Sequence, residues 1–102
     1  MRVEEASCLL VAKVLVADGM MTETERALLE ALVLQLGLDE SERARVIDLE
    51  GMDAAEARLR SEPEERRRAV VDRVLEAALA DGRLSPHEIT AVRGLTEALG
   101  LG

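Results

Sequence analysis

The sequence contains no phenylalanine, tyrosine or tryptophan, and it has only one cysteine, one histidine and two prolines in 102 residues. Without aromatic rings the chain cannot stack nucleic-acid bases on its side chains, which removes a common device of single-strand binding. A single cysteine excludes an intrachain disulfide and predicts a reducing compartment. The core must then consist of aliphatic side chains and methionine, which favours closely packed helices.

Basic residues are also scarce, because 13 Lys and Arg stand against 21 Asp and Glu, for a formal net charge of −8. This balance argues against nucleic acid and anionic membrane surfaces as partners, and it favours cations or basic protein surfaces. The apolar run at 8–17 is interrupted by Lys13 and is too short to span a bilayer. The start of the chain lacks the pattern of a signal peptide. We therefore expect a cytoplasmic protein with no direct membrane insertion.

The chain contains a repeated motif. Ala17-Asp18-Gly19 is followed by Glu25, and Ala80-Asp81-Gly82 is followed by Glu88, at an offset of 63 residues (18 to 81). A Leu-Gly-Leu triplet follows each copy, at 36–38 and at 99–101. A repeat unit needs a partner to cover its apolar face. Units at about 8–38 and 71–101 are therefore expected to pack together as two related helical hairpins.

Each copy of the motif predicts a tight connection between two helices. Gly19 and Gly82 stand where a helix should end, because glycine adopts the left-handed conformation at little steric cost. A capping box then begins the next helix, with a Ser or Thr at the N-cap and a Glu three residues later. The two predicted boxes are Thr22-x-x-Glu25 and Ser85-x-x-Glu88.

Two aspartates in the motif are not required by capping. Asp18 and Asp81 fall in the last turn of the incoming helix, where a carboxylate faces the negative end of the helix dipole at a cost of about 0.3–1 kcal/mol. One reason for them is structural, since Asp can accept N–H bonds from the following turn. The other is ligand binding, because Asp-Gly-x-apolar-Ser/Thr-x-x-Glu matches the second half of an EF-hand calcium loop. The first half is absent, so a hard cation would need oxygens from both connections. The candidate metal ligands are Asp18, Glu25, Asp81 and Glu88.

Apolar periodicity predicts six helices, at about 2–18, 23–36, 40–49, 53–60, 64–81 and 86–99. The first is apolar almost all round, which is typical of a central helix, and Cys8 within it is expected to serve packing. Further capping boxes are predicted at Asp39 with Glu42 and at Ser61 with Glu64. Beyond the first helix, the predicted inward positions are Leu28, Leu29, Leu32, Val33, Leu36, Ala44, Val46, Ile47, Leu49, Met52, Ala55, Leu59, Val70, Val71, Val74, Leu75, Ala78, Leu79, Ile89, Val92, Leu95 and Leu99.

These patterns together predict an all-α fold. We expect one domain over 1–102, a compact bundle of about six helices built from the two hairpins with pseudo-two-fold symmetry. The segment at about 39–63 has no counterpart in the repeat and is expected to form a helical linker between the units.

The doubled motif resembles the TerB-like family of tellurite-resistance proteins. The resemblance rests on the two Ala-Asp-Gly…Glu copies, on the Leu-Gly-Leu triplets that follow them and on Pro63-Glu64-Glu65 before the second copy, and it covers about 8–101. It implies an all-helical domain whose acidic positions, here Asp18, Glu25, Asp81 and Glu88, form a negative surface proposed to bind divalent metal. It also implies a place in bacterial tellurite and general stress operons, alongside membrane proteins. Related domains are fused to DnaJ-like co-chaperones.

Two non-enzymatic functions remain open. The first is a stress-response domain whose acidic surface binds Ca²⁺, Mg²⁺ or Mn²⁺, which carboxylates without a cysteine partner suit better than Zn²⁺, and which docks a partner protein. The second is an acidic helical interaction or co-chaperone-like adaptor with no metal ligand. A protein partner is expected in both cases, and the resemblance implies that it is membrane-associated.

An enzyme is the least favoured class of function. His87 is the only histidine and is expected to be an exposed residue at the start of the last helix. No serine has a base within its motif, Cys8 has none either, and there is no glycine-rich phosphate loop. We therefore predict no catalytic residues.

Overall fold

Helix α1, Val3–Leu15, lies at the centre of the molecule and contacts each of the five other helices. Every residue from Glu5 to Leu15 is buried except Lys13. The Lys13 ammonium reaches solvent and pairs with Glu56 of a neighbouring helix at 2.9 Å. An apolar helix with almost no polar face must be covered on all sides, so the predicted central position is confirmed.

The computed structural model describes residues 1–17, 19, 21–79 and 84–101. In this part of the chain all regular structure is α-helical, which confirms the all-α class. The remaining helices are α2 (Glu23–Gln35), α3 (Glu40–Ile47), α4 (Met52–Arg60), α5 (Glu64–Ala78) and α6 (Pro86–Ala98). None of the described helices is both long enough and apolar enough to cross a membrane.

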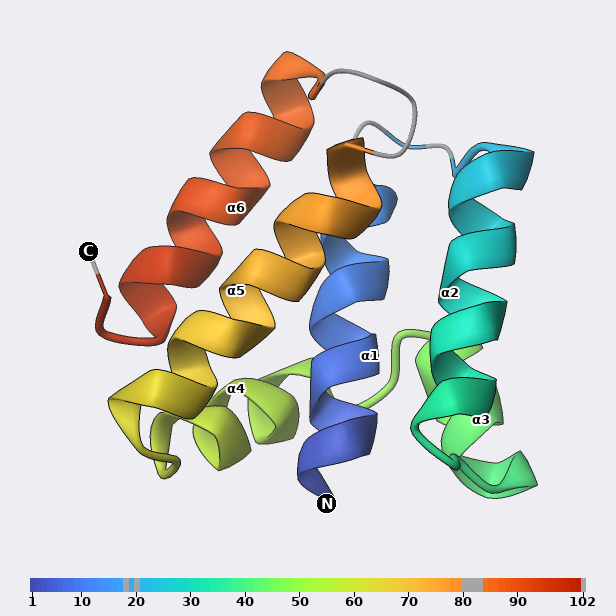
Figure 1. Ribbon diagram of the computed structural model, residues 1–102, viewed down its shortest axis with the longest axis horizontal. Coiled ribbons are helices and arrows are strands. Elements are labelled where there is room, and N and C mark those ends of the chain that lie inside the picture. Colours follow the sequence, from blue (N-terminus) through green and yellow to red (C-terminus); the bar gives the residue numbers. More distant parts are fainter. Residues whose placement is uncertain (18, 20, 80–83, 102) are drawn as a thin grey trace.

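The helices surround α1, and two of them begin at the same end of the molecule (Figure 1). Helix α2 lies on one side of α1, and α5 and α6 lie on the other. Helices α1 and α5 run toward the same end of the molecule, and α2 and α6 begin at that end. Helices α3 and α4 lie toward the opposite end, near the N-terminus. The expected pseudo-two-fold relation between the hairpins stays a prediction.

The Leu-Gly-Leu triplets end α2 and α6 in the same way. Gly37 and Gly100 have positive φ, 70° and 73°, as a left-handed residue after a helix requires. The Leu38 N–H donates to the carbonyl of Val33 at 3.1 Å, and the Leu101 N–H donates to that of Thr96 at 2.9 Å. These are Schellman motifs, which satisfy carbonyls that the last turn leaves open.

Two predicted helix ends and one predicted cap are wrong in detail. Helix α1 ends at Leu15 rather than near 18, so Gly19 (φ 89°) turns the chain after the helix instead of capping it. Helix α5 ends at Ala78 rather than near 81, and its N-cap is Pro63 without a side-chain hydrogen bond. The predicted box at Ser61 is therefore wrong. Ser61 is still helical as the C-cap of α4, so its hydroxyl donates backward to the carbonyl of Arg58 at 2.6 Å.

Several apolar side chains predicted to face inward are exposed instead. They lie on helix faces, or just past a helix end, that the neighbouring helices leave partly uncovered. Ala44 is also exposed. The exposed large apolar residues among those predicted inward are Leu28, Ile47, Leu49, Leu79 and Ile89, at 36–47% of their full accessible surface.

Candidate metal centre

Helices α2 and α6 begin with the same four-residue structure. The Thr22 hydroxyl accepts the N–H of Glu25 at 3.1 Å, and the N–H of Thr22 donates to Glu25 Oε1 at 2.9 Å. The Ser85 hydroxyl accepts the N–H of Glu88 at 3.1 Å, and the N–H of Ser85 donates to Glu88 Oε1 at 3.0 Å. Both predicted capping boxes are confirmed, so each glutamate is held through Oε1 by its own helix.

The two cap glutamates are buried and face each other. Glu25 and Glu88 expose only 4% and 5% of their surface. Burial raises the pKa of Glu25, and the Glu88 carboxyl, close enough for a hydrogen bond between the two groups, raises it further against the opposing cap bonds from Thr22. Two acidic groups from different helices thus meet where water is largely excluded.

One oxygen of this pair lacks a partner. Glu88 Oε2 is buried and accepts no hydrogen bond from the described residues. An unsatisfied buried carboxylate oxygen is costly, and a buried acidic oxygen without a donor calls for a proton or a cation. The capping boxes therefore account for one oxygen of each glutamate and leave Glu88 Oε2 unsatisfied among the described residues.

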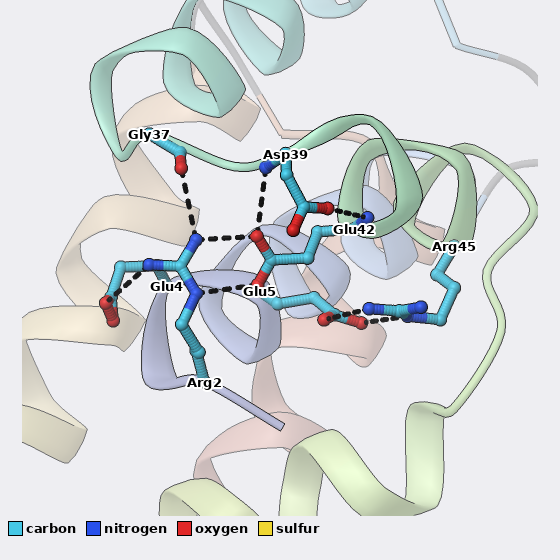
Figure 2. Close-up of polar contacts among 7 residues, drawn as sticks. All are labelled: Arg2, Glu4, Glu5, Gly37, Asp39, Glu42 and Arg45. Atoms are coloured by element: carbon cyan, nitrogen blue, oxygen red, sulfur yellow. Dashed lines mark hydrogen bonds and ion pairs between the residues drawn. The ribbon is translucent and has the colours of Figure 1, made fainter.

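A third capping box shows what a neutralised cap glutamate looks like in this fold (Figure 2). Asp39 and Glu42 form the box that begins α3, as predicted. Arg2 donates to Glu42 from Nε at 2.7 Å and from Nη2 at 2.6 Å, and also donates to the carbonyl of Gly37. The hydrogen bonds from Arg2 lower the pKa of Glu42 to about 2. This glutamate is buried, ionised and fully partnered.

The remaining buried glutamate is paired in the same manner. Glu5, in α1, accepts two hydrogen bonds from Arg45 of α3, at 2.8 and 2.9 Å (Figure 2). Arg45 and Arg2 thus neutralise two of the four buried glutamates. Within the described part of the chain, neither Glu25 nor Glu88 makes an ion pair with a basic side chain.

The structure brings together two of the four predicted metal ligands. Glu25 and Glu88 come into contact, whereas Asp18 and Asp81 lie outside the described residues. Among the residues that are described, no three His, Cys, Asp or Glu side chains are grouped closely enough to hold a metal ion. A site of four carboxylates therefore stays a prediction, while its central pair has a defined geometry.

The other reactive side chains are exposed to solvent or inert. His87 is exposed next to Glu88, as expected. Cys8 is fully buried in α1, and burial raises the pKa of its thiol to about 12, so the thiolate needed for nucleophilic attack is not formed at neutral pH. Among the described residues, the carboxylate oxygens of Glu25 and Glu88 are therefore the only atoms of this pair that could coordinate a metal ion.

Sequence reasoning did not find the ion pairs of Arg2 with Glu42 and of Arg45 with Glu5. Each pair joins residues 40 positions apart, and neither follows from helical spacing. One signal was present, since Glu5 lies next to a long apolar run in a helix expected to be central. A carboxylate at such a position must find a partner.

Comparison with known proteins supports the resemblance that the motifs indicated. No curated protein and no solved structure matches this chain. The model of one family, described as "Tellurite resistance protein TerB", matches residues 4–102. The match includes both connections, both capping boxes and the linker helices between them. With nearly its full length covered by that model, the chain belongs to the TerB family.

Proposed function

We propose that this protein is a non-enzymatic stress-response domain that binds a divalent cation between the starts of α2 and α6. The observation that carries the proposal is Glu88 Oε2, which is buried beside Glu25 and has no partner among the described residues. A cation between the two carboxylates would supply the missing contact and remove their mutual repulsion. The fold neutralises its other buried glutamates with arginine, whereas none of the described arginines pairs with Glu25 or Glu88.

The full ligand set would include Asp18 and Asp81 with the two glutamates. Each aspartate lies in the connection that leads into one of the two capping boxes, so the sequence keeps all four acids within a few residues of the pair. Carboxylate oxygens suit hard cations, and the ions we propose are Ca²⁺, Mg²⁺ and Mn²⁺. Bound there, the ion would join the two hairpins and hold the starts of α2 and α6 together.

The same domain would dock a partner protein in the cytoplasm. The net charge of −8 suits a basic surface on that partner, and exposed Ile47 and Leu49 beside a groove between α1, α2 and α3 add apolar surface. The TerB resemblance points to a membrane-associated partner. We propose no nucleic acid as a ligand, because the charge of the chain opposes it.

The test of cation binding is a titration of the intact, ¹⁵N-labelled chain with Mg²⁺, Mn²⁺ and Ca²⁺ at near-physiological salt. For the diamagnetic ions we expect the amide signals of Glu25, Glu88 and their neighbours to shift together and to saturate at micromolar ion. For Mn²⁺ we expect the same signals to broaden selectively. Glu25→Gln and Glu88→Gln should each weaken binding strongly.

Glu42→Gln is the matched control, because it changes a buried cap glutamate that Arg2 already neutralises. It should leave cation affinity unchanged. Shifts that stay unsaturated at millimolar ion, and that persist in Glu25→Gln, would contradict the proposal.

The alternative is an acidic adaptor that binds no metal. It is favoured by the capping boxes themselves, which account for one oxygen of each glutamate without any ion. The two functions differ in whether capture of the partner protein depends on Glu25 and Glu88. A metal-free adaptor would capture its partner equally well with the Glu25→Gln/Glu88→Gln variant and in the presence of a chelator, whereas a cation-dependent domain would lose capture in both cases.

A further inference from the structure

Two grooves of the molecule are lined by equivalent residues of the sequence repeat. The first groove lies along α1 and α2, and its lining from this hairpin includes Ala12, Met21, Arg26, Leu29 and Glu30. The second groove lies along α5 and α6, and its lining includes Leu75, Leu84, Ile89, Val92 and Arg93. Each residue of the second set stands 63 positions after its counterpart in the first. The two hairpins therefore offer the same kind of groove.

Helix α3 fills the first groove, and the second groove is open. From α3 and the turn after it, Val46, Ile47 and Leu49 line the first groove, and Val46 is fully buried. Among the described residues, the second groove is lined by the α5–α6 hairpin alone. It holds about 480 Å³, against about 190 Å³ for the space that remains beside α3. The chain thus supplies a covering helix to one hairpin and none of the described helices to the other.

The open groove leaves apolar side chains accessible to solvent. Leu29 of the first hairpin is buried, whereas its equivalent Val92 is only half-buried. Ile89 of the groove and Leu79 at the end of α5 expose 42% and 47% of their surface. Apolar side chains that gather in one exposed place bordered by charged residues mark a site of protein interaction.

The charges around the two grooves are opposite. Three ion pairs hold α3 on the first hairpin, and they are Glu30–Arg43, Glu5–Arg45 and Arg2–Glu42, at 2.9, 2.8 and 2.6 Å. At the positions 63 residues after Glu30, Glu5 and Arg2, the second hairpin has Arg93, Arg68 and Glu65. Each charge that receives α3 is therefore reversed on the second hairpin.

The two arginines of the second hairpin are available to a partner. Arg93 is exposed and makes no ion pair with any described residue. Arg68 is exposed and makes only a 3.7 Å contact with Glu64. The α3 helix of a second copy of this chain would bring Arg43 and Arg45 to these positions, and like charges oppose such a contact. The charges thus favour a different helix over a second copy.

We propose that the groove between α5 and α6 docks an amphipathic helix of a partner protein, with acidic side chains where α3 has Arg43 and Arg45. The inference rests on the proposed docking of a partner protein and adds the element that binds. The net charge of −8 belongs to the whole surface, whereas Arg68 and Arg93 determine the charge at this groove. An apolar helix face laid into such a groove is a recurring mode of recognition.

The probes are two synthetic peptides that cover residues 38–50, the segment containing α3. Both carry Glu42→Gln, which can keep the capping box and removes a charge of the same sign as Glu65. One of them, the acidic peptide, also carries Arg43→Glu and Arg45→Glu. The chain as a whole repels the acidic peptide more strongly, because both are negative. A preference for that peptide therefore reports on the groove.

The measurement is a titration of the intact, ¹⁵N-labelled chain with each peptide at near-physiological salt. We expect the acidic peptide to shift the amide signals of Leu75, Val92 and Arg93 until they saturate. The peptide with both arginines should bind there about fivefold more weakly or worse, since an exposed ion pair is replaced by repulsion. Arg93→Glu in the chain should reverse this preference. Ile89→Gln should weaken both peptides, because it removes exposed apolar surface from the groove.

Arg60→Glu is the matched control, because it makes the same charge change at an exposed position of α4, outside the lining of the groove. It should leave both affinities as in the native chain. Equal binding of the two peptides, a preference that persists in Arg93→Glu, or no shift of these amides at millimolar peptide would overturn the inference. Shifts of the same amides on dilution of the peptide-free chain would also overturn it, by showing that a second copy occupies the groove. None of these outcomes decides the cation titration, which reports on Glu25 and Glu88.

Discussion

Glu25 and Glu88 meet at the N-terminal ends of α2 and α6, each held by its own capping box and close enough to hydrogen-bond to the other. Glu42 occupies the equivalent place in the box of α3, but there Arg2 binds the carboxylate through two nitrogens. The same local structure thus occurs in two electrostatic settings. One setting stabilises an ionised glutamate, and the other opposes ionisation of Glu25.

The first prediction concerns the unneutralised pair. In the presence of a chelator, Glu25→Gln should raise the free energy of unfolding at neutral pH, because it removes a buried charge and glutamine can still complete a capping box. Folding raises the pKa of Glu25, so the protonated side chain contributes to the stability of the folded state. This contribution is fully present below the unfolded-state pKa of about 4.3 and is lost as pH rises through the folded-state pKa.

The advantage of Glu25→Gln over the native chain should therefore grow as pH rises above about 4.3. Thermal unfolding followed by circular dichroism between pH 4 and 8 measures this difference. A variant that is less stable than the native chain at every pH would refute the prediction.

The second prediction is a loss of stability, in contrast to the gain expected for Glu25→Gln. Glu42→Gln should destabilise the protein by about 1–3 kcal/mol, because it removes charge-assisted hydrogen bonds to Arg2, and the half-exposed position of Arg2 favours the lower end. The pKa of Glu42 is lowered to about 2, so its contribution is present above about 4.3 and is lost as pH falls toward 2. Urea unfolding at pH 7 and at pH 2.5 tests this, and an equal loss at both pH values would contradict it.

The third prediction concerns Leu49, which has φ 56° and follows α3 as the left-handed residue of a Schellman motif. A side chain in this conformation costs about 1–2 kcal/mol, which glycine avoids. Leu49→Ala and Leu49→Gly remove the same contacts apart from one methyl group. We expect the glycine variant to be the more stable by about 1 kcal/mol in chemical denaturation. Greater stability of the alanine variant would show that the left-handed conformation is not retained.

The fourth prediction compares the two glycines that end α2 and α6. A Cβ at Gly37 meets no atom within 4 Å, whereas one at Gly100 lies 3.1 Å from Arg67 Nη1, which donates to the carbonyl of Leu99. Both residues have positive φ, so Gly37→Ala should cost about 1–2 kcal/mol and Gly100→Ala more. Combining Gly100→Ala with Arg67→Ala should be less than additive. Equal costs for the two glycine variants would exclude a role for the Arg67 contact.

The fifth prediction concerns the buried thiol. Cys8 is fully buried, and burial raises its pKa to about 12. A disulfide reagent such as DTNB should therefore leave the native protein unmodified at pH 8 over the time in which it labels the urea-unfolded chain completely. Labelling in the native state at the rate of the unfolded chain would contradict this burial.

Local signals in the sequence predicted most of the secondary structure. The capping boxes at Thr22, Asp39 and Ser85 and the triplets around Gly37 and Gly100 act within five residues along the chain, so the helix ends they mark are confirmed. Ser61 is the exception. A serine three residues before a glutamate does not begin a helix when it serves as the C-cap of the preceding helix.

Apolar periodicity predicted burial less well. The pattern correctly placed Val46, Leu59 and Leu95 in the core, but it also assigned Ile47 and Ile89 to it. A helix with a wide apolar face buries only the part that another helix covers. Helix α6 contacts α1 and α5 and no other helix extensively, so Ile89 stays exposed beside it.

The sequence by itself determined the helices, the caps and the acidic residues at the two connections, because each depends on a few neighbouring residues and on elementary backbone chemistry. Only the tertiary structure decided which buried glutamates are neutralised. The packing of α3 against α1 brings arginines to Glu5 and Glu42, while the packing of α2 and α6 around α1 brings Glu25 against Glu88. Because both glutamates are buried, this last contact leaves two acids together without a basic partner among the described residues.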